Sequence, residues 1–270
     1  MENRLGITAW TVPWQGEELC AAAEEEGLLA LHLDLGSAAK GYPLMKQENR
    51  AMWLEGANKH HLQIVALALN DLCNHGFTAG IKDARAEIAV TTMLYAVETA
   101  RSMGIPALSV PHFFANRMVD EASFHATAEA LRFLCDRAQE HGILVYTENV
   151  LDASALARLW QEVDRPNLRL LFDTQNYAVL SDVDAADIFE KWHDQCGAYI
   201  HLKDGDGALG NRALWQGASG FERVLAAVLR QGYGGDMILE SNYGDRETLK
   251  RDLAGVRSRI GHKQERNESE

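Results

Sequence analysis

Four acidic or imidazole side chains follow short apolar runs in the second half of the chain, and together they could hold a divalent cation. The runs end in Thr147-Glu148-Asn149, Phe172-Asp173-Thr174, His201-Leu202-Lys203-Asp204 and Glu240-Ser241-Asn242. Three carboxylates brought close together repel one another unless a cation lies between them. Carboxylate oxygens and one imidazole suit Mn²⁺, Mg²⁺ or Co²⁺, with Zn²⁺ as a further candidate. Any one of these residues alone is more often a helix cap or a structural group, so the prediction of a metal site rests on the four together.

The order of apolar and amphipathic segments predicts the scaffold that would bring these groups together. Strand-like runs alternate strictly with helical stretches, which implies a parallel sheet. Eight such units in 270 residues are what a single-domain α/β fold of the (β/α)8 TIM barrel type requires. The rival fold, an open doubly wound sheet, would have a glycine-rich turn after the first strand, and residues 8–14 contain no glycine. The expected strands are residues 5–8, 29–35, 62–69, 107–110, 143–148, 168–173, 198–201 and 237–240.

The helices are predicted from periodicity and from residues that begin or end a helix. The expected helices cover about residues 17–26, 47–59, 83–103, 124–138, 152–163, 182–193, 219–230 and 245–260. The fourth has apolar residues three and four apart from Phe124 to Ala138, and Gly142 is placed to end it. Ser219-Gly220-Phe221-Glu222 has the pattern of a capping box. We expect a barrel over residues 1–260 and a polar C-terminal tail over 261–270.

The alternation of side chains along a strand tests whether the four groups can meet. If Glu148 points into the barrel, Tyr146 and Leu144 do so as well, while Val145 and Ile143 face the helices. By the same reasoning Leu171 accompanies Asp173, Tyr199 accompanies His201, and Ile238 accompanies Glu240. Four consecutive strands would then direct a Glu, an Asp, a His and a Glu to the mouth of the barrel, where barrel active sites are built.

Composition excludes several classes of partner. The formal net charge is −13, with 26 Lys and Arg against 39 Asp and Glu, which argues against a broad surface for nucleic acid or anionic membrane. No apolar span is long enough to cross a bilayer, and the first residues do not form a signal peptide. The four cysteines are far apart in sequence, so we expect free thiols and a cytoplasmic protein. No surface patch argues for or against a homo-oligomer.

The strand-end motifs, together with Trp215-Gln216-Gly217 leading to Phe221, resemble the xylose isomerase-like barrel superfamily in its sugar isomerase and epimerase branch. That branch includes ketose 3-epimerases, inosose isomerases and dehydratases, and hydroxypyruvate isomerases. The resemblance covers nearly the whole chain and implies that Glu148, Asp173, His201 and Glu240 are metal ligands. Many relatives have Asp-Thr-Gly-His at the sixth strand, where this chain has Asp173-Thr174-Gln175-Asn176. Asn176 therefore replaces a histidine, and its amide can still hydrogen-bond a sugar hydroxyl.

The resemblance implies proton transfer at a carbon next to a carbonyl, through an ene-diolate that the metal stabilises. If Glu148 and Glu240 flank that carbon, one removes a proton and the other delivers one to the opposite face, which is epimerisation. One base alone would give an aldose–ketose isomerase, and departure of a β-hydroxyl would give a dehydratase of an inosose-like substrate. The substrate would be a small keto-sugar or keto-polyol. No phosphate-binding nest is evident in the sequence, which favours an unphosphorylated one.

Further residues at the expected mouth are candidates for binding substrate. Lys203 could neutralise a carboxylate or hold a substrate oxygen, or it could form a structural ion pair. Trp10, Trp14 and Trp215 could pack on a sugar face, or they could simply pack within their loops. Asn70 follows the third expected strand and His112 follows the fourth, and both could line the pocket.

Two other functions remain open within the same superfamily. A non-catalytic sugar-binding barrel is conceivable because Asn176 replaces a histidine, although the four predicted ligands are intact. A metal-dependent endonuclease for abasic DNA would need more histidine ligands and a basic groove, which the charge of −13 disfavours.

Overall fold

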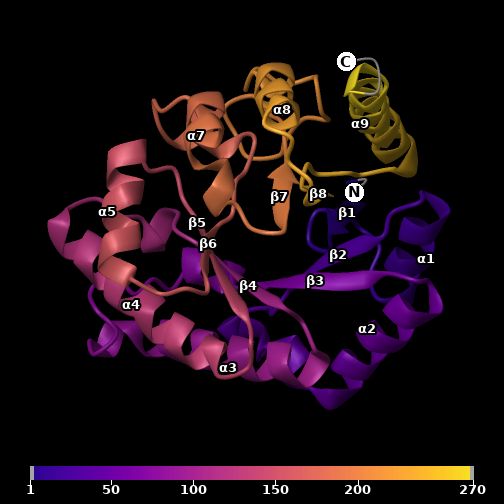
Figure 1. Cartoon of the computed structure of the whole chain (residues 1–270). Coiled ribbons are helices and arrows are strands. Elements are labelled where there is room, and N and C mark those ends of the chain that lie inside the picture. Colours follow the sequence, from indigo (N-terminus) through magenta and orange to yellow (C-terminus); the bar gives the residue numbers. More distant parts are fainter. Residues whose placement is uncertain (1–2, 268–270) are drawn as a thin grey trace.

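Strands and helices alternate along the chain, and the strands form one ring of parallel neighbours surrounded by helices (Figure 1). The computed structural model describes residues 3–267, with side chains described up to residue 261. The strands are β1 (Leu5–Thr8), β2 (Ala30–Asp34), β3 (Gln63–Ala68), β4 (Ala107–Pro111), β5 (Leu144–Glu148), β6 (Leu168–Leu170), β7 (Tyr199–Leu202) and β8 (Asp236–Leu239). The predicted (β/α)8 TIM barrel is therefore confirmed.

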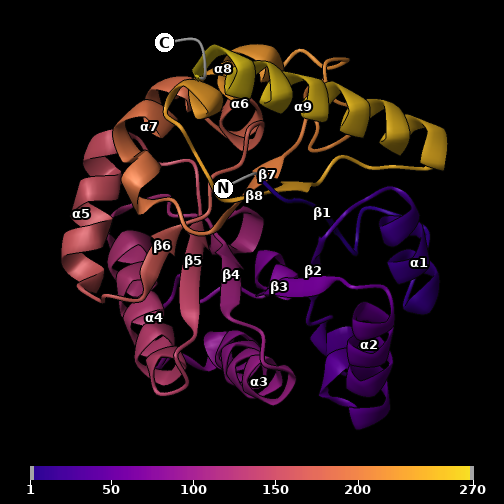
Figure 2. The same cartoon turned by 45° about the vertical axis from the view of Figure 1, so that its right-hand side comes forward.

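Helices form the outer layer of the barrel, and Figure 2 shows them around the ring of strands. They are α1 (Glu17–Glu25), α2 (Gln47–Lys59), α3 (Glu87–Met103), α4 (Glu121–Gln139), α5 (Ala153–Val163), α6 (Asn176–Leu180), α7 (Ala185–Trp192), α8 (Phe221–Arg230) and α9 (Arg246–Asn267). The predicted apolar face of α4 is buried, and Gly142 adopts a left-handed conformation with φ +69° in the turn that follows. None of the helices in the described part of the chain has the length and apolar character needed to span a membrane.

The ring is nearly closed, and the closing contact brings two predicted site residues together. The strand order is β6-β5-β4-β3-β2-β1-β8-β7, so β6 and β7 are the two ends of the sheet. Beyond β6 the chain runs beside β7, where the His201 amide donates to the Phe172 carbonyl (2.9 Å) and the Thr174 amide donates to the His201 carbonyl (3.2 Å). Asp173 and His201 thereby become parallel bridge partners.

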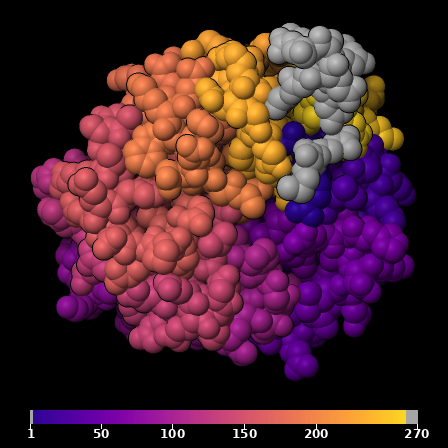
Figure 3. All heavy atoms as spheres, in the orientation of Figure 1, coloured from indigo at the N-terminus to yellow at the C-terminus, as the bar shows by residue number. Residues whose placement is uncertain are grey.

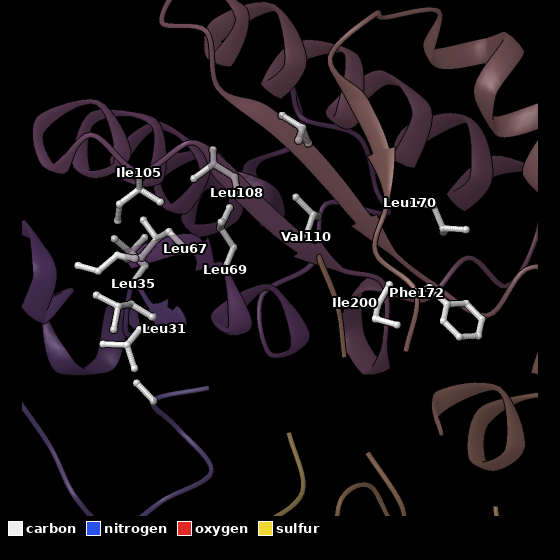
Figure 4. Close-up of a cluster of buried hydrophobic side chains, with 14 of the residues drawn as sticks. Leu31, Leu35, Leu67, Leu69, Ile105, Leu108, Val110, Leu170, Phe172 and Ile200 are labelled. Carbon is white, nitrogen blue, oxygen red and sulfur yellow. The ribbon is translucent and has the colours of Figure 1, made fainter. Parts of the chain in front are cut away.

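The inward and outward positions of the strands agree with the predicted alternation. One buried cluster inside the barrel contains Tyr146, Leu171, Tyr199 and Ile238, with Leu144 packed against it. The outward-facing residues of the same strands join the larger core between strands and helices. Figure 4 shows part of that core, including Leu67, Leu108, Val110, Leu170 and Phe172. Burial on both faces is why these strands read as nearly continuous apolar runs.

Three local predictions differ from the structure. Ser219 does not form a capping box, because its hydroxyl donates to Asp204 Oδ1 (2.6 Å) and Gly220 precedes α8 without a side-chain cap. The expected helix over 182–193 is the shorter α7, and the unexpected α6 begins at Asn176, in the segment between β6 and α7. The last helix continues beyond Ile260 to Asn267, so most of the expected tail is helical; residues 268–270 lie outside the described residues.

The beginning and the end of the described chain lie side by side, as the indigo and yellow regions of Figure 3 show. Strands β1 and β8 pair directly. The Asn3 side-chain amide donates to the carbonyl of Gly235 (2.7 Å), and Arg246 forms an ion pair with Glu25. This pairing is what a ring of strands requires, because the first strand must meet the last.

Candidate active site

The structure brings Glu148, Asp173, His201 and Glu240 together at the carboxyl ends of β5 to β8. One donor atom from each residue can be chosen so that all four lie within 4.8 Å of one another. His201 Nδ1 lies 2.9 Å from Glu240 Oε2, 3.7 Å from Glu148 Oε1 and 4.0 Å from Asp173 Oδ2. The four groups therefore surround a common point, as the strand-end motifs predict.

Neighbouring side chains and amides hold the three carboxylates in place. The Asn176 side-chain amide donates to Glu148 Oε1 (2.8 Å), and Trp10 Nε1 donates to Glu240 Oε1 (3.2 Å). Asp173 Oδ1 accepts the backbone amides of residues 175 and 176, both at 2.7 Å. Each carboxylate thus has at least one oxygen bound by the protein, which restrains the orientation of the group.

The donor atoms that point to the common point fit a divalent cation. Asp173 Oδ2 and His201 Nδ1 are buried, and neither makes a well-aligned hydrogen bond, although Lys203 and Glu240 lie close to them. Buried polar atoms are normally satisfied, and a cation bound by carboxylates and imidazole would satisfy both. Lys203 Nζ lies 2.7 Å from Glu240 Oε2 and 3.0 Å from Asp173 Oδ2, so a positive charge already faces the same carboxylates.

Burial and charge act against each other on the pKa values of these groups. Burial raises the pKa of Asp173 to about 6 in spite of the attraction of Lys203. Burial alone would lower the pKa of His201, but Glu240 and Glu148 raise it to about 10. Burial would raise the pKa of Glu240, yet Lys203 and His201 hold it well below its usual value. Strongly shifted values of this kind gather at functional sites.

A cavity of about 290 Å³ opens above the four groups. Its polar lining includes Glu148, Glu240, Lys203 and Asn176, and Asn70 and Asn242 extend it. Its apolar lining is made by Trp10, Cys73, Pro111, Phe113, Phe114 and Leu209. A small cavity with one apolar wall and several hydrogen-bonding groups suits a molecule of the size and character of a sugar.

Three residues predicted to bind substrate lie elsewhere. His112 follows Pro111 in the chain and points to the opposite side, where its ring packs on Phe77 (5.9 Å between centroids). Trp14 lies under the guanidinium of Arg246, 5.5 Å from the ring centroid. Trp215 packs edge-on against Phe221 (5.0 Å between centroids). None of the three is among the residues that line the cavity. Their side chains make the packing contacts just described instead.

Several residues of this site are not among those predicted from the sequence. Phe113 and Phe114 line the cavity just beyond β4, and their position after a predicted strand could have indicated this. His32 in β2 is another such residue, and its ring lies 5.1 Å from that of His201 between centroids. A histidine inside a strand gives no sign in the sequence of which distant ring it will meet.

A TIM barrel with this set of acidic and imidazole groups at its mouth has the architecture of a barrel enzyme, whose active site lies at the carboxyl ends of the strands. The chain belongs to the xylose isomerase-like TIM barrel family, whose profile matches residues 20–259.

Known proteins of similar sequence or fold agree with this membership. The chain is 32% identical over 233 residues to the 2-epi-5-epi-valiolone 7-phosphate 2-epimerase of Actinoplanes sp. (strain SE50/110), covering 84% of this chain and 83% of that protein. The fold is similar to a xylose isomerase domain protein from Planctomyces limnophilus (TM-score 0.75, 18% identity, 98% and 99% of the two chains). It is also similar to the D-allulose 3-epimerase of Methylomonas sp. (TM-score 0.73, 16% identity, 96% and 98%). The chain is an enzyme of the isomerase and epimerase class.

Proposed function

We propose that this enzyme is a divalent-metal-dependent epimerase that transfers a proton at a carbon next to the carbonyl of a keto-sugar or keto-polyol. The observation that carries the proposal is the convergence of one donor atom each from Glu148, Asp173, His201 and Glu240 within 4.8 Å of one another. Glu148, Asp173, His201 and Glu240 would hold the metal, which when bound supplies Lewis-acid polarisation of the substrate carbonyl.

The protein's own residues supply the proton transfer. Glu148 ends β5 and Glu240 directly follows β8, with β6 and β7 between these strands in the ring, and both side chains line the cavity. One carboxylate removes the proton from the substrate carbon, and the other delivers a proton to the opposite face, which inverts the centre. Asn176 fixes the orientation of Glu148 through its hydrogen bond at 2.8 Å. Trp10 restrains Glu240 and forms part of the apolar wall, which keeps water from the reacting carbon.

The substrate class that we favour is a keto-cyclitol, because the relative of 32% identity is named for a 2-epimerase of a valiolone phosphate. We infer an unphosphorylated substrate for this chain. Among the described residues that line the cavity, Lys203 is the one with a positively charged side chain. Since it is already engaged with Glu240 and Asp173, no free cation of the lining is left to bind a phosphate.

Hydrogen–deuterium exchange tests the proposal directly. The chain, freed of metal by a chelator and reloaded with Mn²⁺, is incubated in D₂O with valiolone-type keto-cyclitols and ketohexoses, each free and phosphorylated. We expect one deuteron in the epimerised product, and Glu148→Gln should lower turnover by roughly 10²–10⁴-fold while the circular dichroism spectrum stays unchanged. Exchange that survives Glu148→Gln or complete chelation would contradict the proposal, and a product lighter by one water would indicate a dehydratase.

A cytoplasmic location is the second part of the proposal. All four cysteines are free thiols, and Cys20 and Cys135 are buried. Burial raises the pKa of Cys73, which lines the cavity, to about 12, so its thiol is protonated and unreactive at neutral pH. Free thiols of this kind are typical of a reducing compartment.

A further inference from the structure

The metal-facing nitrogen of His201 depends on a second histidine that lies deeper in the barrel. His32, in β2, is fully buried. Its Nδ1 lies 3.0 Å from His201 Nε2, and its Nε2 lies 3.1 Å from the hydroxyl oxygen of Ser109 in β4. The three side chains come from β7, β2 and β4, and they form one line of hydrogen bonds across the interior of the barrel.

The direction of these hydrogen bonds decides whether His201 can bind a metal. A neutral imidazole has one N–H and one lone pair. For Nδ1 of His201 to offer its lone pair to a cation, the hydrogen must lie on Nε2, which then donates to Nδ1 of His32. His32 must consequently hold its own hydrogen on Nε2 and donate it to Ser109, whose hydroxyl can accept.

The opposite direction would disable the site. If His32 donated from Nδ1, Nε2 of His201 would accept and the hydrogen of His201 would lie on Nδ1. That hydrogen would point at the space between Glu240, Glu148 and Asp173, where the proposed cation binds. Ser109 therefore matters as much as His32. Its hydroxyl accepts the hydrogen on Nε2 of His32, which leaves Nδ1 of His32 free to accept from His201.

We propose that His32 and Ser109 are positioning residues that fix the ring orientation of His201 and the tautomer that it takes in the metal-bound state, with the hydrogen on Nε2 and the lone pair of Nδ1 directed to the metal. This inference rests on the metal-dependent function proposed above. Neither residue lines the cavity, so neither acts on substrate. Outer partners of this kind are commonly worth about 10–100-fold in metal affinity.

The test measures metal binding rather than turnover. The full chain is stripped with a chelator and titrated with Mn²⁺, and the free ion is followed by electron paramagnetic resonance. His32→Phe keeps a ring but has no acceptor, and we expect its affinity to fall by about 10–100-fold. His32→Asn places an amide oxygen where Nδ1 stood and should restore most of the affinity. Leu33→Ala, on the outward face of the same strand, should lower the melting temperature but leave the affinity unchanged.

Ser109 gives a second, milder pair of variants, should His32→Phe not fold. Ser109→Ala removes the acceptor for His32 and should weaken Mn²⁺ binding several-fold, whereas Ser109→Thr should keep it near the wild-type value. Nitrogen chemical shifts of ¹⁵N-histidine in the Zn²⁺-loaded chain should show His201 protonated at Nε2 and His32 protonated at Nε2.

The outcomes separate this inference from the proposed function. A wild-type chain that binds no Mn²⁺ at this site would overturn the metal-dependent function. A wild-type chain that binds Mn²⁺, with His32→Phe and Ser109→Ala binding it equally well, would overturn the positioning role alone. An affinity of His32→Asn as low as that of His32→Phe would likewise contradict the role of His32 as acceptor.

Discussion

Replacing Lys203 with methionine should destabilise the metal-free protein and make its stability more sensitive to metal. The ammonium of Lys203 is 2.7 Å from Glu240 and 3.0 Å from Asp173, and both carboxylates are almost inaccessible to water. Methionine keeps much of the length and volume of the side chain but leaves these carboxylates without their counter-ion. The site would then hold three acidic groups facing His201 alone.

The expected magnitude follows from this burial. Removing one partner of a buried ion pair costs about 3–5 kcal/mol, because the remaining charge is left uncompensated in a medium of low polarity. A domain of ordinary stability has only about 5–15 kcal/mol to lose, so the change is easy to measure. A bound divalent cation would compensate the same carboxylates and should remove part of the difference. Metal at about 100 times its dissociation constant adds about 2.7 kcal/mol to any chain that binds it only when folded.

Urea unfolding followed by circular dichroism measures both effects, once with chelator and once with saturating Mn²⁺. We expect Lys203→Met to lose about 3–5 kcal/mol in chelator and to lie closer to the wild type with Mn²⁺. Lys59→Met removes the exposed ion pair with Glu17 and should change little in either condition. A loss below about 1 kcal/mol in chelator, or a difference that Mn²⁺ leaves unchanged, would refute the view that Lys203 neutralises these carboxylates.

Burial lowers the pKa of His112 in the folded chain to about 3, whereas in the unfolded chain it is about 6.5. Because the unfolded chain then binds a proton that the folded chain does not, the free energy of unfolding falls as the pH drops below about 6.5. Between about pH 6.5 and 5, His112→Phe should remove about 2 kcal/mol of this acid sensitivity in urea titrations. Tyr146→Phe leaves the Ala198 amide without the acceptor that now lies at 2.7 Å and should cost about 1–3 kcal/mol, read from the melting temperature. Metal binding must displace the proton that His201 holds with a pKa of about 10, so Mn²⁺ affinity should rise about tenfold per pH unit near neutrality; calorimetric titrations showing no proton release would contradict this.

Sequence patterns predicted the barrel and the four strand-end groups that meet at its mouth because both depend on local periodicity. Alternation of strand-like and helical segments allows few topologies. Alternation of inward and outward residues along a strand then fixes which strand-end side chains face the mouth, as Tyr146 beside Glu148 illustrates. Prediction was weaker where a loop conformation or a tertiary contact decides what a side chain binds. Ser219 reaches Asp204 instead of capping α8, and Trp215 packs on Phe221 instead of lining the cavity.

Contacts across the barrel were decided only by the tertiary structure. His32 meets His201 because β2 and β7 lie across the ring from each other, although the two residues are 169 positions apart in the chain. The pairing of β2 with β3 also shifts register between Leu31 and His32, which alters the height of His32 within the barrel. Strand tilt and stagger set such heights, and no single segment of sequence encodes them. The sequence by itself therefore determined which side chains point inward, and closure of the ring determined which of them touch.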